Sequence, residues 1–209
     1  MGNYNSVNTL LGNNLPMQSG MLSLVMGPMY AGKTTYLIDL YEKNIKFGKK
    51  VIVVTHSSEI RYSIENLSTH NKKFITCLKH ASIKEFLQKN TDEISNANVI
   101  MVDESQFFED LMEVLYLVNT LCKEVYVFGL DGDFKRNKFG NILDLIPHCD
   151  EVKKLKAKCN RCEKDAIFSY RITNNSKQVL VGSSDDYQAL CRLCYNNAIN
   201  SMFNYSCIY

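Results

Sequence analysis

MGPMYAGKTT, residues 26–35, contains two glycines separated by four positions and followed by lysine and threonine. In a G-x-x-x-x-G-K-[ST] motif, backbone N–H groups surround phosphate oxygens, the lysine reaches the outer phosphates, and the hydroxyl oxygen binds Mg²⁺. We therefore predict a phosphate-binding loop in which Thr34 is also a Mg²⁺ ligand. Its members are Gly27, Pro28, Met29, Tyr30, Ala31, Gly32, Lys33 and Thr34.

The sequence on either side of this loop supplies the context that the motif needs. Residues 21–26 form a short apolar run, which favours a strand. From residue 34 to about residue 47, apolar side chains recur in a helical rhythm that stops at Gly48. The order strand, loop and helix places the motif at a helix N-terminus, where an anion is favoured.

Further along the chain, apolar runs alternate with helical patterns. We predict strands at residues 50–55, 97–102 and 124–130, and helices at residues 82–90 and 107–122. Continuous β-branched runs are typical of parallel strands that are covered on both faces. The predicted fold class is α/β, a parallel sheet of the phosphate-loop nucleotide-binding type flanked by helices, with ligands at the carboxyl ends of the strands.

Two acidic residues, Asp103 and Glu104, directly follow the strand predicted at residues 97–102. Phosphate-loop nucleoside triphosphatases use a carboxylate at such a strand end to order Mg²⁺ or its water shell. A second carboxylate can accept a proton from an attacking hydroxyl group when it lies within hydrogen-bond reach. We expect Asp103 to serve the metal and Glu104 to be a general base; the alternative is a pair of solvated carboxylates.

The cysteines contain two C-x-x-C pairs, Cys159 with Cys162 and Cys191 with Cys194. Four thiolates give Zn²⁺ a closed tetrahedral site, so we predict a structural zinc ion in a small ribbon-like β unit. The alternative is a chance cluster of reduced cysteines. The remaining cysteines are expected to be small apolar side chains in or near a core: Cys77, Cys122, Cys149 and Cys207.

Length and composition limit the classes of protein that this chain can belong to. With 209 residues, 45% hydrophobic and 22% charged, it is long enough for one α/β core and a smaller unit. A net charge of +2 gives no reason to expect nucleic acid as a partner. No apolar run approaches roughly 18 residues and no signal peptide is evident, so we expect a cytoplasmic protein without a membrane partner. The predicted division is a flexible leader at 1–20, the α/β domain at 21–150, the zinc unit at 151–196 and a tail at 197–209.

Several segments together resemble the cellular and poxvirus-type thymidine kinases, the zinc-containing class. They are MGPMYAGKTT, VDESQFF at residues 102–108, GLDGDFKRNKFG at 129–140, the paired cysteines and CRLCY at 191–195. The resemblance implies transfer of the γ-phosphate of ATP to the 5′-hydroxyl of thymidine, or of deoxyuridine, in the salvage of DNA precursors. It also implies a homotetramer and feedback inhibition by thymidine triphosphate.

The resemblance further implies roles for individual residues. Glu104 matches the catalytic base of the family and Asp103 its strand-end acid, while Arg61 matches an arginine that contacts phosphates. Ser105 and Gln106 extend the set that binds ATP. The thymidine pocket is implied to include side chains from the α/β core and the zinc unit, and a lasso-like loop that grips the base through its backbone. These residues are Met29, Phe107, Leu130, Phe134, Ser169 and Tyr187, with the loop at Val179, Leu180, Val181 and Gly182.

The chain departs from the family pattern at three positions. Ser105 stands where glycine is common, Asp133 where a small hydroxyl residue is frequent, and Ser169 where threonine is expected. Two other readings stay open on the residues alone. One is a deoxynucleoside kinase of broader specificity, and the other is a phosphate-loop ATPase whose zinc ribbon binds nucleic acid or protein.

Overall fold

The computed structural model describes residues 19–58, 66–68, 74–173, 176–178 and 186–205. Arg61, the loop at residues 179–182 and most of the leader lie outside the described residues. Among the helices of the described ranges, none has the length and apolar character needed to cross a membrane.

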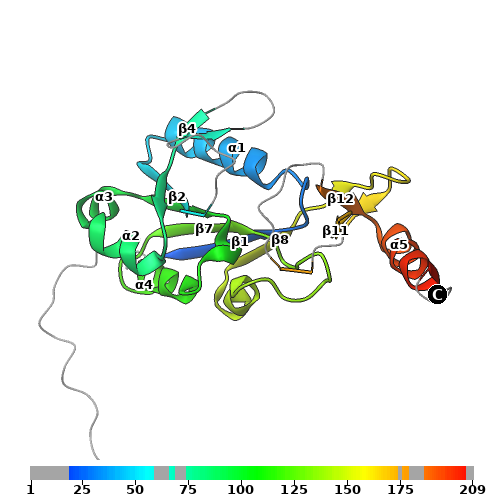
Figure 1. Ribbon diagram of the computed structural model, residues 1–209. Coiled ribbons are helices and arrows are strands. Elements are labelled where there is room, and N and C mark those ends of the chain that lie inside the picture. Colours follow the sequence, from blue (N-terminus) through cyan, green and yellow to red (C-terminus); the bar gives the residue numbers. More distant parts are fainter. Residues whose placement is uncertain (1–18, 59–65, 69–73, 174–175, 179–185, 206–209) are drawn as a thin grey trace, which may run out of the picture.

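A six-stranded sheet forms the centre of the molecule (Figure 1). The strand order is β5-β2-β6-β7-β1-β8, and every neighbouring pair is parallel. The parallel α/β prediction is therefore confirmed. The strands are β1 (Met21–Met26), β2 (Val51–His56), β5 (Leu78–His80), β6 (Val99–Asp103), β7 (Glu124–Gly129) and β8 (Glu151–Lys154).

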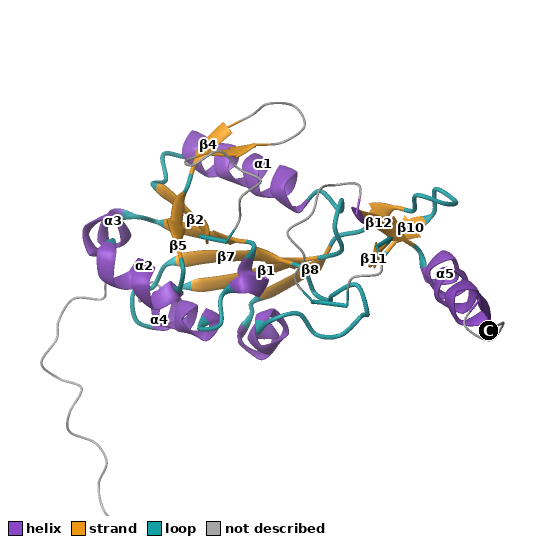
Figure 2. Ribbon diagram, viewed as in Figure 1, coloured by secondary structure: helices purple, strands orange, loops and turns teal. Residues whose placement is uncertain are grey.

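Helices cover both faces of this sheet (Figure 2). On one face, Leu37 and Ile38 of α1 pack with Val25 of β1, while the other face of the same strand packs with Leu117 of α4. Because both faces are covered, β6 is buried along its whole length. The helices around the sheet are α1 (Lys33–Lys46), α2 (Ile83–Lys89), α3 (Thr91–Asn96), α4 (Val114–Asn119) and the 3₁₀-helix η3 (Ile142–His148).

The single helix predicted at residues 107–122 is wrong in detail. The chain forms two short 3₁₀ turns, η1 (Ser105–Phe107) and η2 (Leu111–Glu113), before α4 begins at Val114. Between them, the carboxylate of Asp110 accepts hydrogen bonds from the backbone N–H groups of Ile83 and Lys84 at 2.9 and 2.8 Å. The segment is therefore tied to the start of α2 instead of continuing as one helix.

A second, smaller unit follows the central sheet. Two antiparallel pairs, β9 with β10 and β11 with β12, lie beside α5 and enclose their own apolar cluster. Ile167 lies between β10 and β11 and belongs to neither strand. The elements are β9 (Ala157–Lys158), β10 (Asp165–Ala166), β11 (Phe168–Arg171), β12 (Tyr187–Leu190) and α5 (Arg192–Tyr205).

Two further features complete the fold. A short antiparallel hairpin, β3 (Asn66–Ser68) with β4 (Phe74–Thr76), follows β2 in the chain. The strand β8 comes after the predicted domain boundary at residue 150 but pairs with β1 of the central sheet. The boundary itself stays a prediction.

Candidate active site

The predicted phosphate loop connects β1 to α1. Gly32 has a φ of 79°, in the left-handed region that favours glycine, and α1 begins at the next residue. The Lys33 ammonium donates hydrogen bonds to the backbone carbonyls of Gly27 and Pro28 at 3.2 and 2.8 Å. The lysine therefore folds back over the loop, which is the direction needed for contact with a phosphate held there.

The two acidic residues at the end of β6 are both buried, Asp103 at 2% and Glu104 at 7% exposure. Glu104 has a φ of 50°, a backbone conformation that costs a non-glycine residue free energy and is often found at functional sites. The Gln106 amide nitrogen donates a hydrogen bond to the Glu104 carboxylate at 2.6 Å. Its amide oxygen accepts one from the backbone N–H of Leu130 at 3.0 Å. Gln106 thus links the predicted base to the loop after β7.

Close packing fixes this glutamine and its neighbour Ser105. A Cβ atom at Gly129 would lie 2.5 Å from the Ser105 hydroxyl oxygen, and one at Gly140 would lie 2.1 Å from the Gln106 carbonyl oxygen. Both glycines are therefore required by space, and Gly140 also by its φ of 59°. The turn after β6 has little freedom to move.

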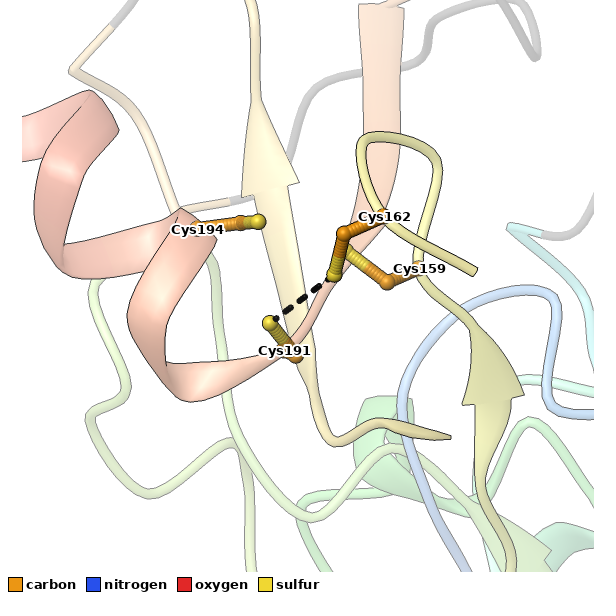
Figure 3. Close-up of side chains that lie close together, drawn as sticks. All are labelled: Cys159, Cys162, Cys191 and Cys194. Atoms are coloured by element: carbon orange, nitrogen blue, oxygen red, sulfur yellow. Dashed lines mark hydrogen bonds between the residues drawn. The ribbon is translucent and has the colours of Figure 1, made fainter. Parts of the chain in front are cut away.

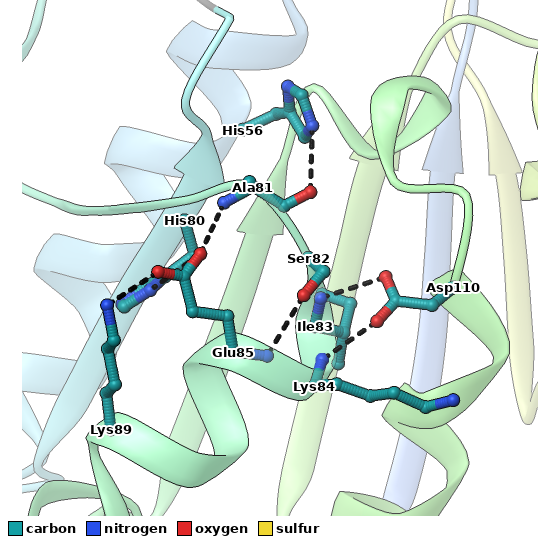
Figure 4. Close-up of polar contacts among 9 residues, drawn as sticks. All are labelled: His56, His80, Ala81, Ser82, Ile83, Lys84, Glu85, Lys89 and Asp110. Carbon is teal, nitrogen blue, oxygen red and sulfur yellow. Dashed lines mark hydrogen bonds and ion pairs between the residues drawn. The ribbon is translucent and has the colours of Figure 1, made fainter.

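Two aromatic rings pack against Phe107, the last residue of η1. The Phe107 ring meets the Phe139 ring edge-on, with centroids 5.6 Å apart, and its centroid lies 5.9 Å from that of His56. Figure 4 shows the His56 ring directed toward the Ala81 carbonyl, at 3.1 Å. The sequence analysis did not single out His56, which is the last residue of β2.

The smaller unit, residues 157–205, touches the predicted phosphate loop directly. The backbone N–H of Met29 donates a hydrogen bond to the Ser169 hydroxyl at 2.9 Å, and the Tyr30 hydroxyl donates one to the Tyr187 carbonyl at 3.4 Å. Ser169 is 4% exposed, so the first contact is shielded from water. The structure therefore brings two predicted nucleoside residues next to the predicted phosphate site.

The loop after β7 is also joined to the smaller unit. The Tyr195 hydroxyl donates a hydrogen bond to the Phe134 carbonyl at 2.6 Å. The Phe134 ring lies under the guanidinium of Arg171, 3.8 Å from its central carbon. Arg171 and Asp133, which is buried, were not among the predicted site residues, because their contacts join segments that are distant in sequence.

The four paired cysteines converge between β9, β12 and α5 (Figure 3). Their sulfur atoms all lie within 4.8 Å of one another, and those of Cys162 and Cys191 are 3.6 Å apart. A tetrahedral Zn²⁺ with bonds of about 2.3 Å needs sulfur atoms about 3.8 Å apart, so Cys159, Cys162, Cys191 and Cys194 fit a structural zinc site. Burial raises the pKa of Cys159, but hydrogen bonds from backbone N–H groups outweigh it and lower that pKa to about 6.

The fold and these contacts define an α/β protein with a phosphate-loop sequence and a four-cysteine cluster that fits a zinc ion. The sequence profile of the family described as "Thymidine kinase" matches residues 20–195, most of the chain. This chain belongs to the thymidine kinase family.

Named relatives come from plants, viruses and mammals. The chain is 38% identical to "Thymidine kinase" of Variola virus (isolate Human/India/Ind3/1967) over 179 residues, covering 86% of this chain and 98% of the relative. It is 37% identical to "Thymidine kinase" of Oryza sativa subsp. japonica over 183 residues, covering 86% and 68%. It is 32% identical to "Thymidine kinase, cytosolic" of Cricetulus griseus over 193 residues, covering 92% and 80%.

Proposed function

We propose that this protein is a thymidine kinase that transfers the γ-phosphate of ATP to the 5′-hydroxyl of thymidine and of deoxyuridine. Membership of the thymidine kinase family carries the proposal. The Met29–Ser169 hydrogen bond supports it, because a kinase needs its phosphate donor and its acceptor side by side.

The proposed phosphate site uses the loop between β1 and α1. Phosphoryl transfer depends on in-line positioning and on neutralising the charge of the equatorial oxygens. Lys33 and backbone N–H groups of the loop bind the phosphates, and Arg61, outside the described residues, adds a positive charge. Thr34 and Asp103 offer the oxygen ligands that Mg²⁺ prefers and would hold the ion, which would supply positive charge against the phosphates of bound ATP.

In this proposal Glu104 is the general base. Its carboxylate accepts the proton of the 5′-hydroxyl as that oxygen attacks the γ-phosphorus, and the ADP leaving group departs on the opposite side. Gln106 holds one carboxylate oxygen through the 2.6 Å hydrogen bond. The phosphate therefore passes to a nucleoside hydroxyl rather than to water only if the nucleoside is placed against Glu104.

The proposed nucleoside pocket combines the α/β core with the zinc unit. Phe107, Leu130 and Phe134 belong to the core side, while Ser169 and Tyr187 come from β11 and β12. Backbone groups of residues 179–182 are proposed to read the pyrimidine edge. An unpaired buried polar group costs about 1–3 kcal/mol, which disfavours purines and cytosine. Zinc at the four cysteines would keep Ser169 and Tyr187 in place.

Three further properties are proposed on the family resemblance. They are feedback inhibition by thymidine triphosphate, a homotetrameric assembly and a cytoplasmic location. A reducing compartment is consistent with a four-thiolate zinc site, which an oxidising compartment would convert to disulfides.

The test is a substrate panel. Purified protein with Mg²⁺ and ATP is given thymidine, deoxyuridine, deoxycytidine, deoxyadenosine or deoxyguanosine, and each 5′-monophosphate is measured directly. Product from thymidine and deoxyuridine alone is expected. Product from several bases would replace the narrow pocket with a broader kinase, and ATP hydrolysis stimulated by a polynucleotide, without nucleoside product, would favour an ATPase.

A further inference from the structure

Arg171, the last residue of β11, is a buried guanidinium with an unusual set of partners. It is 3% exposed, and its nitrogen atoms donate hydrogen bonds to two backbone carbonyls, those of Lys177 and Gln178, the latter at 2.9 Å. Its Nε donates to the Tyr187 hydroxyl at 3.0 Å. One planar group therefore joins the chain before residue 179 to the chain after residue 186.

Aromatic rings complete the surroundings of this charge. The guanidinium carbon lies 3.8 Å from the centroid of the Phe134 ring and 5.0 Å from that of Tyr187. Stacking of this kind is attractive and is stronger when it is shielded from water. The position of Arg171 consequently depends on two rings that belong to the proposed nucleoside pocket.

The Asp133 carboxylate provides a second set of contacts to this region, through Gln178. It is 7% exposed, and one carboxylate oxygen accepts hydrogen bonds from the backbone N–H groups of Lys135 and Asn137, both at 2.8 Å. The other oxygen accepts one from the Gln178 side-chain amide at 3.0 Å. Gln178 is thus held through its backbone by Arg171 and through its side chain by Asp133.

The strand β11 connects this arrangement to the phosphate loop. Ser169 and Arg171 are two positions apart, so their side chains leave the same face of the strand. Ser169 accepts the hydrogen bond from Met29, while Arg171 holds Gln178 and Tyr187. A shift of Arg171 would therefore change the spacing between the nucleoside residues and the phosphate site.

We propose that Arg171 and Asp133 are positioning residues for the nucleoside site, which fix Gln178, Tyr187 and the Phe134 ring relative to one another. The proposal rests on the proposed kinase function. It adds to that function two charged residues that are not expected to touch the substrate and that act through the residues they hold.

The experiment compares Arg171→Met, Arg171→Lys and Asp133→Asn with the parent chain. Arg192→Met is the matched control, because Arg192 is an exposed arginine of the same unit whose guanidinium lies 5.0 Å from the Phe168 ring centroid. Each purified protein is assayed for the KM of thymidine, the KM of ATP, kcat, zinc content and hydrogen exchange at residues 176–178 and 186–188.

Arg171→Met is expected to raise the KM of thymidine by about 10- to 100-fold, since hydrogen bonds from a charged donor are lost. The KM of ATP should change by less than about twofold, and hydrogen exchange at residues 176–178 and 186–188 should rise. Arg171→Lys should have a KM of thymidine nearly as high as that of Arg171→Met, because one ammonium group cannot replace a planar guanidinium with several donors. Asp133→Asn should raise the KM of thymidine by a smaller factor, and Arg192→Met should match the parent.

Two results would overturn the proposal. One is unchanged hydrogen exchange in Arg171→Met, and the other is an equal rise in both KM values. Should Arg171→Met lose zinc or fail to fold, the decision passes to Asp133→Asn, whose unchanged exchange and KM would count against the proposal. If the parent fails to phosphorylate thymidine, the proposed function is wrong, and hydrogen exchange alone then decides whether Arg171 holds this region.

Discussion

Gln106 provides a direct test of how the proposed base is held. It is 3% exposed, donates to Glu104 at 2.6 Å and accepts from the Leu130 N–H at 3.0 Å. Gln106→Leu removes both contacts while it retains a side chain of similar size. A hydrogen bond to a charged group contributes about 1.5–3 kcal/mol. Because 1.36 kcal/mol corresponds to a factor of ten in rate, kcat should fall about 10- to 150-fold.

The assay measures kcat with saturating ATP and thymidine, alongside the free energy of unfolding. That free energy should also fall by about 1–3 kcal/mol, because the Leu130 N–H loses its acceptor. Gln88→Leu, on an exposed position of α2, is the control. A kcat of Gln106→Leu within twofold of the parent would refute the idea that Gln106 orients the base.

Four further outcomes are expected. Glu104→Gln should keep its affinity for ATP but lose turnover by orders of magnitude, whereas near-normal turnover would remove Glu104 from the role of base. The purified protein should contain one zinc ion per chain, and either a chelator or Cys162→Ser should lower both the melting temperature and the activity. The control, Cys122→Ser, should leave the melting temperature and the activity unchanged. Gly140→Ala should lower the free energy of unfolding by about 2–4 kcal/mol, because a Cβ atom there would meet the Gln106 carbonyl. Gly48 also has a positive φ but open space around it, so Gly48→Ala should cost only about 1 kcal/mol. Equal losses in the two variants would show that packing around Gly140 is unimportant. Burial and the neighbouring Asp150 raise the pKa of Cys149 to about 11, so the contribution of this thiol to stability is complete below pH 9 and is lost between pH 9 and 11. In Cys149→Ala, the free energy of unfolding should therefore decline less over that pH interval. An unchanged decline would exclude this contribution.

Much of the fold could be predicted because the signals were local. The strand predicted at residues 21–26 has those bounds in the structure, and the cysteine spacing was sufficient to predict the four-sulfur cluster. The prediction of a single helix at residues 107–122 was wrong for a physical reason. Phe108, Leu111, Val114 and Leu117 are all fully buried at intervals of three, a spacing that suits 3₁₀ turns as well as an α-helix.

The candidate site was only partly predictable. Glu104 could be proposed from its place at a strand end, whereas the partners of Arg171 could not, because they depend on how β11, β12 and the loop after β7 meet in space. The contact between Asp133 and Gln178 joins residues 45 positions apart. Sequence patterns report the environment of neighbouring residues and carry little information on such pairs.

The position of β1 within the sheet has a consequence for chain synthesis. Its two neighbours are β7 and β8, so this apolar strand has no partner until the growing chain has passed residue 124. At about 5–20 residues per second, the nascent chain exposes it for several seconds. During translation the strand before the proposed phosphate loop therefore stays unpaired until later strands emerge, and unpaired apolar strands of this kind favour aggregation.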